Sequence, residues 1–480
     1  MTPLLRIAAA AALLGVVGAG CAVGPDFVRP DPPVAEGWRD ADAPAVDARP
    51  AADSRWWGVF GDPILDDLVA AAHAGNPTLR AAAARILQAR ARRGIAAGNL
   101  FPQSQQAAGG WTRAELSRNR ANQTSPGLLG TFNDVQIGFD AAWELDVWGR
   151  FRRGIEAAEA ELLAAGADYD DVLVSLAAEV ARTYTEIRVL EARLDAAERN
   201  VAIQQRSADI TRAKFRNGVV TELDVAQARS LLAATRAAIP ALAASLRQAE
   251  NALCTLLGLP PQDLRDRLGP RAPIPAAPQR VAVGIPADLL RRRPDVRAVE
   301  QRLAAQSARI GIAASDLYPQ LSLVGSIQLA AEDFADLAES RSLEAFGGPS
   351  FRWSILNYGR IRNNVRVQEA AFQELIAAYE TTVLIAQQEV ENALAALLGA
   401  RREAELRAEA VAAARRAAEL SGLQYREGAI DYVRVLNAQA QLASEEDRLA
   451  STRGNVTLAA VALYKALGGG WEPDPPSPSP

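Results

Sequence analysis

The most regular pattern in the chain is a strict alternation of apolar and polar residues over residues 134–147. One face carries large apolar side chains and the other carries Asp134, Asp140, Glu144 and Asp146. The alternation predicts a long β-strand that is apolar on its outer side and acidic on its inner side. Such a strand is long enough to cross a bilayer, for which a tilted strand needs about 9–11 residues.

The same alternation returns in the second half of the chain. It involves Leu321, Leu323, Ile327 and Leu329, and then Phe351, Trp353 and Ile355. Residues 103–111 form a weaker strand that is supported mainly by a repeat described below. All four junctions between these strands and the neighbouring helices carry an aromatic side chain, as an interfacial girdle would. These residues are Phe101, Trp148, Tyr318 and Tyr358. A soluble sandwich is the alternative, and it would leave the long helices unexplained.

Long helices follow the strands. Residues 150–217 contain no Pro and place apolar residues at heptad spacing, and residues 360–427 do the same, which predicts left-handed coiled coils. The first helix would be roughly 100 Å long, its returning partner over residues 219–258 about 60 Å and the helix over residues 77–100 about 36 Å. Two short helices stacked end to end would therefore lie beside one long helix. Pro240 should bend the returning helix.

The chain repeats itself at an offset of about 210 residues. Residues 99–102 (Asn-Leu-Phe-Pro) return at 316–319, Trp148-Gly149-Arg150 returns as Tyr358-Gly359-Arg360, and the motif ending at Gly218 returns at Gly428. The two glycines are natural left-handed stops for the helical hairpins. We therefore expect two quasi-equivalent halves, and an offset this large excludes a solenoid.

Clusters of Pro and Gly mark the boundaries between the segments of the chain. We expect a signal peptide at 1–20, a Pro-rich arm at 21–60, a first repeat at 61–258, a Pro-rich connector at 259–287, a second repeat at 288–468 and a tail at 469–480. The first repeat would hold helices 62–100, 150–217 and 219–258 and strands within 102–148. The second would hold helices 288–317, 360–427 and 429–467 and strands within 319–358.

The amino terminus reads as a lipoprotein signal. An uncharged run over residues 7–20 ends in small residues and is followed by Cys21. The run is shorter than the ~20 residues of a membrane-spanning helix, and the cysteine stands where bacterial lipoproteins carry their lipid. Cys21 would then be the lipidation site, although a Cys within an ordinary secretory signal remains the alternative. No other stretch is apolar enough for a helical span.

Composition removes several functional classes. The chain has 2 Cys and 1 His, too few for a His/Cys metal site or a disulfide framework. The single histidine, His73, lies in an Ala-rich helical stretch and is expected on the helix surface. No phosphate-binding loop is present. The net charge of −5 is spread along the chain, so we expect no nucleic-acid partner. From the residue counts and the missing motifs we also expect no catalytic residues and no cofactor apart from a covalent lipid on Cys21.

Four strands cannot close on themselves in lipid, because two open edges would leave backbone groups unsatisfied. Two copies would give eight strands with a filled bore. Three copies would give twelve strands with a wet lumen, which suits an acidic inner face.

The residues 21–27 (Cys-Ala-Val-Gly-Pro-Asp-Phe), the duplicated Phe/Tyr-Pro before a strand, the duplicated aromatic-Gly-Arg after one and the Tyr-Arg-Glu-Gly motif at 425–428 resemble the outer membrane factors of the TolC and NodT type, close to the OprM-like lipoprotein efflux channels. The resemblance implies a mainly α fold with a transmembrane β part, closed as a homotrimer with a 12-strand β-barrel and a 12-helix α-barrel. It also implies a periplasmic adaptor protein, an inner-membrane pump of the resistance-nodulation-division class, and an outer membrane location.

The resemblance also assigns roles to residues at the hairpin tips. Tyr425 and Asp224 match positions that hold the periplasmic gate shut by a hydrogen bond, with Asp431, Arg434 and Asn437 near the constriction. Gly218, Gly428, Arg216 and Arg426 match the tips that face the adaptor. The implied function is an efflux channel that conducts passively. The outer component of a type I secretion system and, less favoured, a lipid-anchored periplasmic coiled-coil scaffold are the alternatives.

Overall fold

The computed structural model describes residues 22–47, 49, 55–115, 117 and 131–471. The chain divides into two compact units, each drawn from three separate stretches. The sheet unit comprises Met1–Asp31, Arg85–Ala165 and Val299–Ala378, and the helical unit comprises Pro32–Ala84, Gly166–Ala298 and Tyr379–Pro480. Each unit combines residues from both sequence repeats, so the repeats are not separate domains in space.

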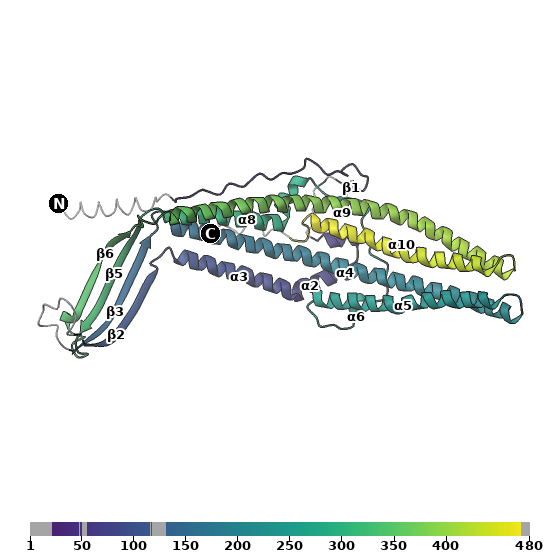
Figure 1. The fold of residues 1–480 in the computed structure, drawn as a ribbon, viewed down its shortest axis with the longest axis horizontal. Helices are drawn as coiled ribbons and strands as arrows, with labels where there is room; N and C mark the ends of the chain where they lie inside the picture. The colour runs from purple at the N-terminus through teal and green to yellow at the C-terminus, as the bar shows by residue number, and fades with distance from the viewer. Residues whose placement is uncertain (1–21, 48, 50–54, 116, 118–130, 472–480) are drawn as a thin grey trace. The chain divides into compact units, whose positions relative to one another are not determined.

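The sheet unit contains one antiparallel sheet of four strands in the order β2-β3-β5-β6 (Figure 1). The strands are β2 (Ser104–Glu115), β3 (Thr131–Leu145), β5 (Gln320–Ala331) and β6 (Leu343–Arg352). Strand β3 ends earlier than residue 147 because the carboxylate of Asp146 accepts hydrogen bonds from the backbone N–H groups of Phe151 and Arg152, at 2.9 and 3.0 Å. Trp353 and Ile355, expected within a strand, follow the end of β6.

The register of the sheet places odd-numbered residues opposite odd-numbered residues at every strand pair. Phe139 lies opposite Ala107 on one side and Ile327 on the other, and Ile327 lies opposite Ala345. Because paired residues of antiparallel strands point to the same side, one face of the sheet consists entirely of odd-numbered residues. Its exposed apolar members are Trp111, Ile137, Phe139, Leu323, Ile327, Leu343 and Phe351.

The opposite, even-numbered face is mainly polar. It carries Asp140 beside Ser326 and Gln328 beside Glu344, with Gln328 donating to the carboxylate of Glu344 at 2.9 Å. Three exposed large apolar residues on this face depart from the expected pattern: Phe132, Val324 and Phe346. The two-faced sheet predicted from alternation is therefore present, with three large apolar exceptions on the polar side.

The long helices are α4 (Arg150–Arg216) and α9 (Arg360–Arg426), each continuous, and the returning helices are α5 (Glu222–Leu256) and α10 (Tyr432–Ala466) (Figure 1). Helix α5 continues through Pro240. Shorter helices are α2 (Pro63–Gly75), α3 (Pro77–Gly98), α6 (Arg265–Leu268), α7 (Leu289–Arg292) and α8 (Pro294–Ser315), with 3-10 turns η1 (Trp56–Phe60), η3 (Pro286–Asp288) and η4 (Ser340–Ser342).

The helices expected over residues 62–100 and 288–317 are both interrupted. Asn76 and Arg293 have extended backbones, with ψ of 124° and 120°. Each precedes a proline, and the proline ring disfavours the helical conformation at the residue before it. The break divides α2 from α3 in the first repeat and α7 from α8 in the second.

These interruptions are the joints at which the short helices meet end to end. The side chain of Asn76 donates to the carbonyl of Leu256 at 2.9 Å, and that of Arg293 donates to the carbonyl of Ala466 at 2.9 Å. Both joints lie in the helical unit and occupy equivalent positions of the two repeats. In each, a side chain satisfies the last carbonyl of a returning helix, where no intrahelical partner is available.

The Pro-rich arm and the connector contribute to the core of the helical unit. Strand β1 (Val46–Asp47) pairs in parallel with β4 (Val281–Ala282) of the connector. Trp56 is 1% exposed and stacks on Tyr464 with ring centroids 5.4 Å apart. We expected His73 on the helix surface, but the residue is half-buried. Its ring contacts Trp57 edge to face and its Nε2 is buried, so burial lowers the pKa of His73.

The heptad seam is buried over the middle of the long helices. Val180, Ile187 and Leu194 of α4 are buried, as are Val383 and Val390 of α9. None of the helices in the described part of the chain combines the length and apolar content needed to span a membrane.

Candidate functional site

The tips of the helical hairpins are built around Gly218 and Gly428, which take left-handed φ values of 73° and 79°. Val219 N–H donates to the carbonyl of Lys214 and Ala429 N–H donates to that of Gln424, each at 2.9 Å. This is the hydrogen bond that closes a Schellman turn, in which glycine is favoured because it carries no Cβ. Both helices therefore stop where the repeat predicts, by the same local mechanism.

Beside these turns, the four long and returning helices share a small hydrophobic core, which we call the tip core. Its buried members come from α4, α5, α9 and α10 and are Ala208, Ala228, Leu232, Tyr425, Tyr432 and Val435. Tyr425 and Tyr432 meet edge to face with ring centroids 5.4 Å apart. The tip core is one of the contacts that join the two hairpins of one chain.

Tyr425 contacts residues of both α4 and α10 in and around the tip core. Its hydroxyl donates to Thr211 Oγ1 at 3.3 Å, and the Thr211 hydroxyl donates to the carbonyl of Ser207 at 2.9 Å. The ammonium of Lys214 lies 4.3 Å from the centroid of the tyrosine ring and also donates to the carbonyl of Tyr425. Burial raises the pKa of the Tyr425 hydroxyl, and the negative charge of Asp224 raises it further.

Asp224 lies in the first turn of α5, where it completes a capping box. Its Oδ2 accepts hydrogen bonds from the backbone N–H and the hydroxyl of Thr221, both at 2.9 Å. Within the described chain the hydrogen bonds of Asp224 and Tyr425 thus go to two different threonines. The pair lies close enough for the carboxylate to influence the tyrosine, and a direct bond between them stays a prediction.

The remaining predicted tip residues are exposed. Asp431 is the N-cap residue of α10, and Arg434 and Asn437 follow it on the first turns of that helix. Arg216 and Arg426 are the last residues of α4 and α9. A positive charge is favourable at a helix C-terminus in any protein, so their position alone does not assign them a partner.

The sequence analysis missed a polar stripe along α4. Asn200, Gln204, Ser207 and Thr211 recur at 3-4 spacing and are all buried. The amide of Asn200 donates to the carboxylate of Glu446 at 2.8 Å, whereas both amide atoms of Gln204 lack a partner among the described residues. The signal in the sequence was the heptad spacing itself, which continues past Val201 with polar residues in place of apolar ones.

The sheet unit places the aromatic residues at the strand–helix junctions. Phe101, Tyr318 and Tyr358 are 65%, 40% and 94% exposed. Trp148 is half-buried, stacks on Tyr318 with centroids 4.6 Å apart, and donates to the carbonyl of Pro319 at 2.8 Å.

Cys21 lies outside the described residues, but the residues that follow it contact the same junction. The N–H of Val23 donates to the carbonyl of Trp148 at 3.0 Å, and the guanidinium of Arg153 donates to the carboxylate of Asp26 at 2.8 Å. A Cβ on Gly149 would lie 2.7 Å from Ala22. The start of the arm is thus fixed to the end of the sheet where α4 begins.

No candidate metal site is found among the described residues. No group of three or more His, Cys, Asp and Glu side chains there is arranged so that it could hold a metal ion. Cys254 is fully buried, and its nearest polar contact is the carbonyl of Gln262 at 3.6 Å from the sulfur.

A model of a protein family described as "Outer membrane efflux protein" matches residues 68–259 and 285–469. The chain belongs to the outer membrane efflux protein family. It is 35% identical over 443 residues to the pyoverdine export outer membrane protein OpmQ of Pseudomonas putida, covering 92% of this chain and 93% of OpmQ. It is also 30% identical to nodulation protein T of Rhizobium leguminosarum bv. viciae, covering 96% and 93% of the two chains.

Solved structures agree with this assignment. The outer-membrane channel OprN matches with a TM-score of 0.88 at 35% identity, over 94% of this chain and 100% of OprN. The resemblance to outer membrane factors and the TolC-like fold class, mainly α with a small β part, are both confirmed, whereas closure as a homotrimer stays a prediction. The chain is thus an outer membrane efflux family member whose two-faced sheet and paired helical hairpins are the parts available for function.

Proposed function

We propose that this protein is the outer membrane channel subunit of a tripartite efflux system and that it works as a homotrimer. The main support for this proposal is the open four-stranded sheet, whose odd-numbered face is apolar and exposed. Strands β2 and β6 each pair with one strand in the described chain, so both edges offer unpaired backbone groups. Three copies would supply each edge with a neighbour and leave a polar interior for water.

The relatives support efflux over the alternatives. OpmQ is named for pyoverdine export, and OprN is described as an outer-membrane channel. We propose that an inner-membrane pump of the resistance-nodulation-division class and a periplasmic adaptor supply energy and substrate, so this chain conducts passively and performs no covalent step. The exposed tips at Gly218 and Gly428, with Arg216 and Arg426, would receive the adaptor.

Single-channel recording tests the conduit directly. Protein purified in detergent and added to a planar bilayer should give discrete conductance steps, and its mass in solution should be that of three chains plus detergent. A coiled-coil scaffold predicts no conductance and a protein that stays dispersed without detergent. Either result would refute the proposal.

A second experiment separates small-molecule efflux from protein secretion. Deletion of the gene should raise intracellular retention of a fluorescent efflux substrate such as ethidium, and the full-length gene should restore its export. If retention does not change while a secreted protein disappears from the medium, the type I secretion alternative is correct.

Cross-linking of the adaptor to a cysteine placed at Arg426 should depend on both tip glycines.

We further propose that Cys21 carries a lipid. The support is the contact of the following residues with the strand–helix junction, which would hold an acylated residue 21 near the end of the sheet. Mass spectrometry of the mature N-terminal peptide should show a diacylglycerol-modified Cys. An unmodified peptide that begins elsewhere would remove the proposal.

A further inference from the structure

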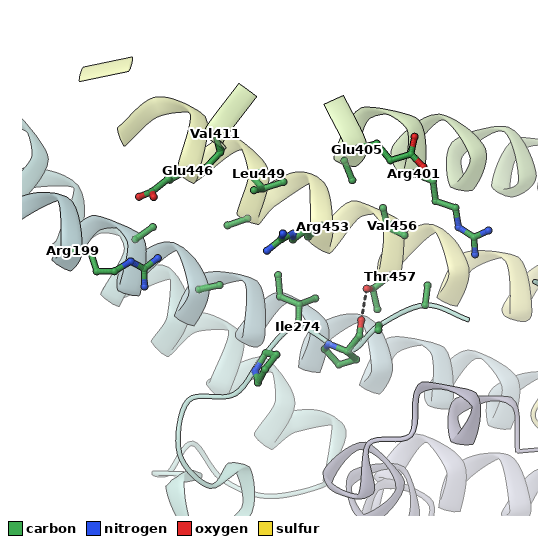
Figure 2. Close-up of a pocket in the computed structure, with 18 of the residues that line it drawn as sticks. Arg199, Ile274, Arg401, Glu405, Val411, Glu446, Leu449, Arg453, Val456 and Thr457 are labelled. Atoms are coloured by element: carbon green, nitrogen blue, oxygen red, sulfur yellow. Dashed lines mark hydrogen bonds between the residues drawn. The ribbon is translucent and has the colours of Figure 1, made fainter. Parts of the chain in front are cut away.

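The helical unit contains a cleft whose lining includes none of the hairpin-tip residues described above. It lies between α4, α9, α10 and residues 273–277 of the connector, and its volume is about 590 Å³ (Figure 2). Cavities of roughly 300–1,000 Å³ are typical of small-molecule sites. The cleft is therefore large enough for a small organic molecule.

The connector forms a fixed roof over this cleft. The hydroxyl of Thr457 donates to the carbonyl of Pro275 at 2.6 Å, as the dashed line in Figure 2 shows. The guanidinium of Arg401 donates to the carbonyl of Gln279 at 2.8 Å and also to that of Pro278. Two helices thus fasten the roof from two directions, so the cleft exists before any ligand enters. A preformed site avoids much of the ordering cost of binding.

The surfaces of the three helices and the roof that line the cleft are largely apolar. They are contributed by Ala192, Ala196, Ile274, Val411, Leu449, Ala450 and Val456. An apolar body of a ligand would displace water from these side chains, which favours binding in proportion to the area covered.

Charge at the cleft is unbalanced. Arg199 of α4 and Arg453 of α10 line it, both are exposed, and neither makes an ion pair or hydrogen bond with the described residues. The nearby Glu446 is already engaged, because its two oxygens accept from Arg415 and from Asn200 at 2.5 and 2.8 Å. Glu405 pairs with Arg402, at 2.9 Å. Two guanidinium groups on opposite helices are thus left to bind an anion.

We propose that this cleft binds a small organic anion with an apolar body, such as an aromatic or aliphatic carboxylate or sulfonate. The anionic group would lie between Arg199 and Arg453, and the body would occupy the apolar floor under Ile274. Guanidinium groups suit this role because their planar N–H donors match the two oxygens of a carboxylate or a sulfonate. The ligand is thereby distinguished from a neutral or cationic molecule of the same shape.

The test compares two fluorescent probes that share one apolar body, 5-dimethylaminonaphthalene-1-sulfonate and the corresponding uncharged sulfonamide. Each is titrated into the full-length protein in an uncharged maltoside detergent, with empty micelles as the blank. The sulfonate should bind with saturable fluorescence enhancement. The sulfonamide should bind about tenfold more weakly or worse, which corresponds to the loss of one charged contact.

The variant R199Q/R453Q should weaken sulfonate binding by about tenfold or more while leaving the weak sulfonamide signal unchanged. The matched control R212Q/R416Q removes the same charge from α4 and α9 at exposed positions outside the cleft, and should bind like the wild type. Equal affinity of the two probes, or equal binding by wild type and R199Q/R453Q, would overturn the proposal. Single-channel conductance of the same variants should be unaltered, so failure here is separable from failure of the channel proposal.

Discussion

Replacing Tyr425 should loosen the hairpin tips in two graded steps. Tyr425 is 4% exposed and its ring contacts Tyr432, whereas its hydroxyl makes one hydrogen bond, to Thr211, at 3.3 Å. Tyr425→Phe keeps the ring and loses a weak bond, and the Thr211 hydroxyl still donates to Ser207. We expect a cost of about 0.5–1 kcal/mol. Tyr425→Ala removes the ring from the tip core and should cost about 3–5 kcal/mol.

Hydrogen exchange measures this cost locally. Amides of residues 205–215 and 432–440 should exchange about a hundredfold faster or more in Tyr425→Ala, since 1.4 kcal/mol corresponds to a factor of ten. The same variant should show a larger single-channel conductance, because the tip core joins the two hairpins. Leu423→Ala is the control, since Leu423 lies two residues before Tyr425 on α9, is 44% exposed and is not part of the tip core. Unchanged exchange in Tyr425→Ala, or an equal effect of Leu423→Ala, would refute the assignment of the tip core as the joint.

Three further outcomes follow from the described contacts. Ile327→Arg, on the apolar face of the sheet, should abolish recovery of detergent-stable trimers from outer membranes, because a lipid-facing Arg costs about 2–4 kcal/mol, while Gln328→Arg on the other face should assemble normally. Gly454→Ala should lower the free energy of unfolding by about 1–3 kcal/mol, since its Cβ would lie 2.2 Å from a valine methyl carbon of α4; Gly422→Ala has open space and should raise it by up to about 1 kcal/mol in the same urea titration. Burial raises the pKa of the Tyr184 hydroxyl to about 12, so the unfolded chain loses this proton near pH 10 whereas the folded chain still holds it. The free energy of unfolding should therefore fall by up to about 1.4 kcal/mol per pH unit between pH 10 and 12. Thermal melts over that range should show a correspondingly smaller fall for Tyr184→Phe.

The candidate site was predictable where local chemistry decides the structure. Gly218 and Gly428 could be recognised as helix stops because a left-handed turn needs a residue without a Cβ. Asp224 was placed correctly at the start of α5, where Thr221 three residues earlier donates to its carboxylate, and its predicted bond with Tyr425 stays a prediction. Thr211 and Tyr432 were missed, since their contact with Tyr425 depends on how four helices pack.

The sequence by itself determined the two-faced strands, the heptad helices, their turns and the duplication, because each depends on periodicity or on a residue's intrinsic backbone preference over a few neighbours. Tertiary structure alone decided that the two repeats interleave to build each compact unit, that Asn76 and Arg293 are joints between stacked helices, and that Arg199 and Arg453 face one cleft. These features arise from contacts between residues far apart in the chain, whose partners no local pattern specifies.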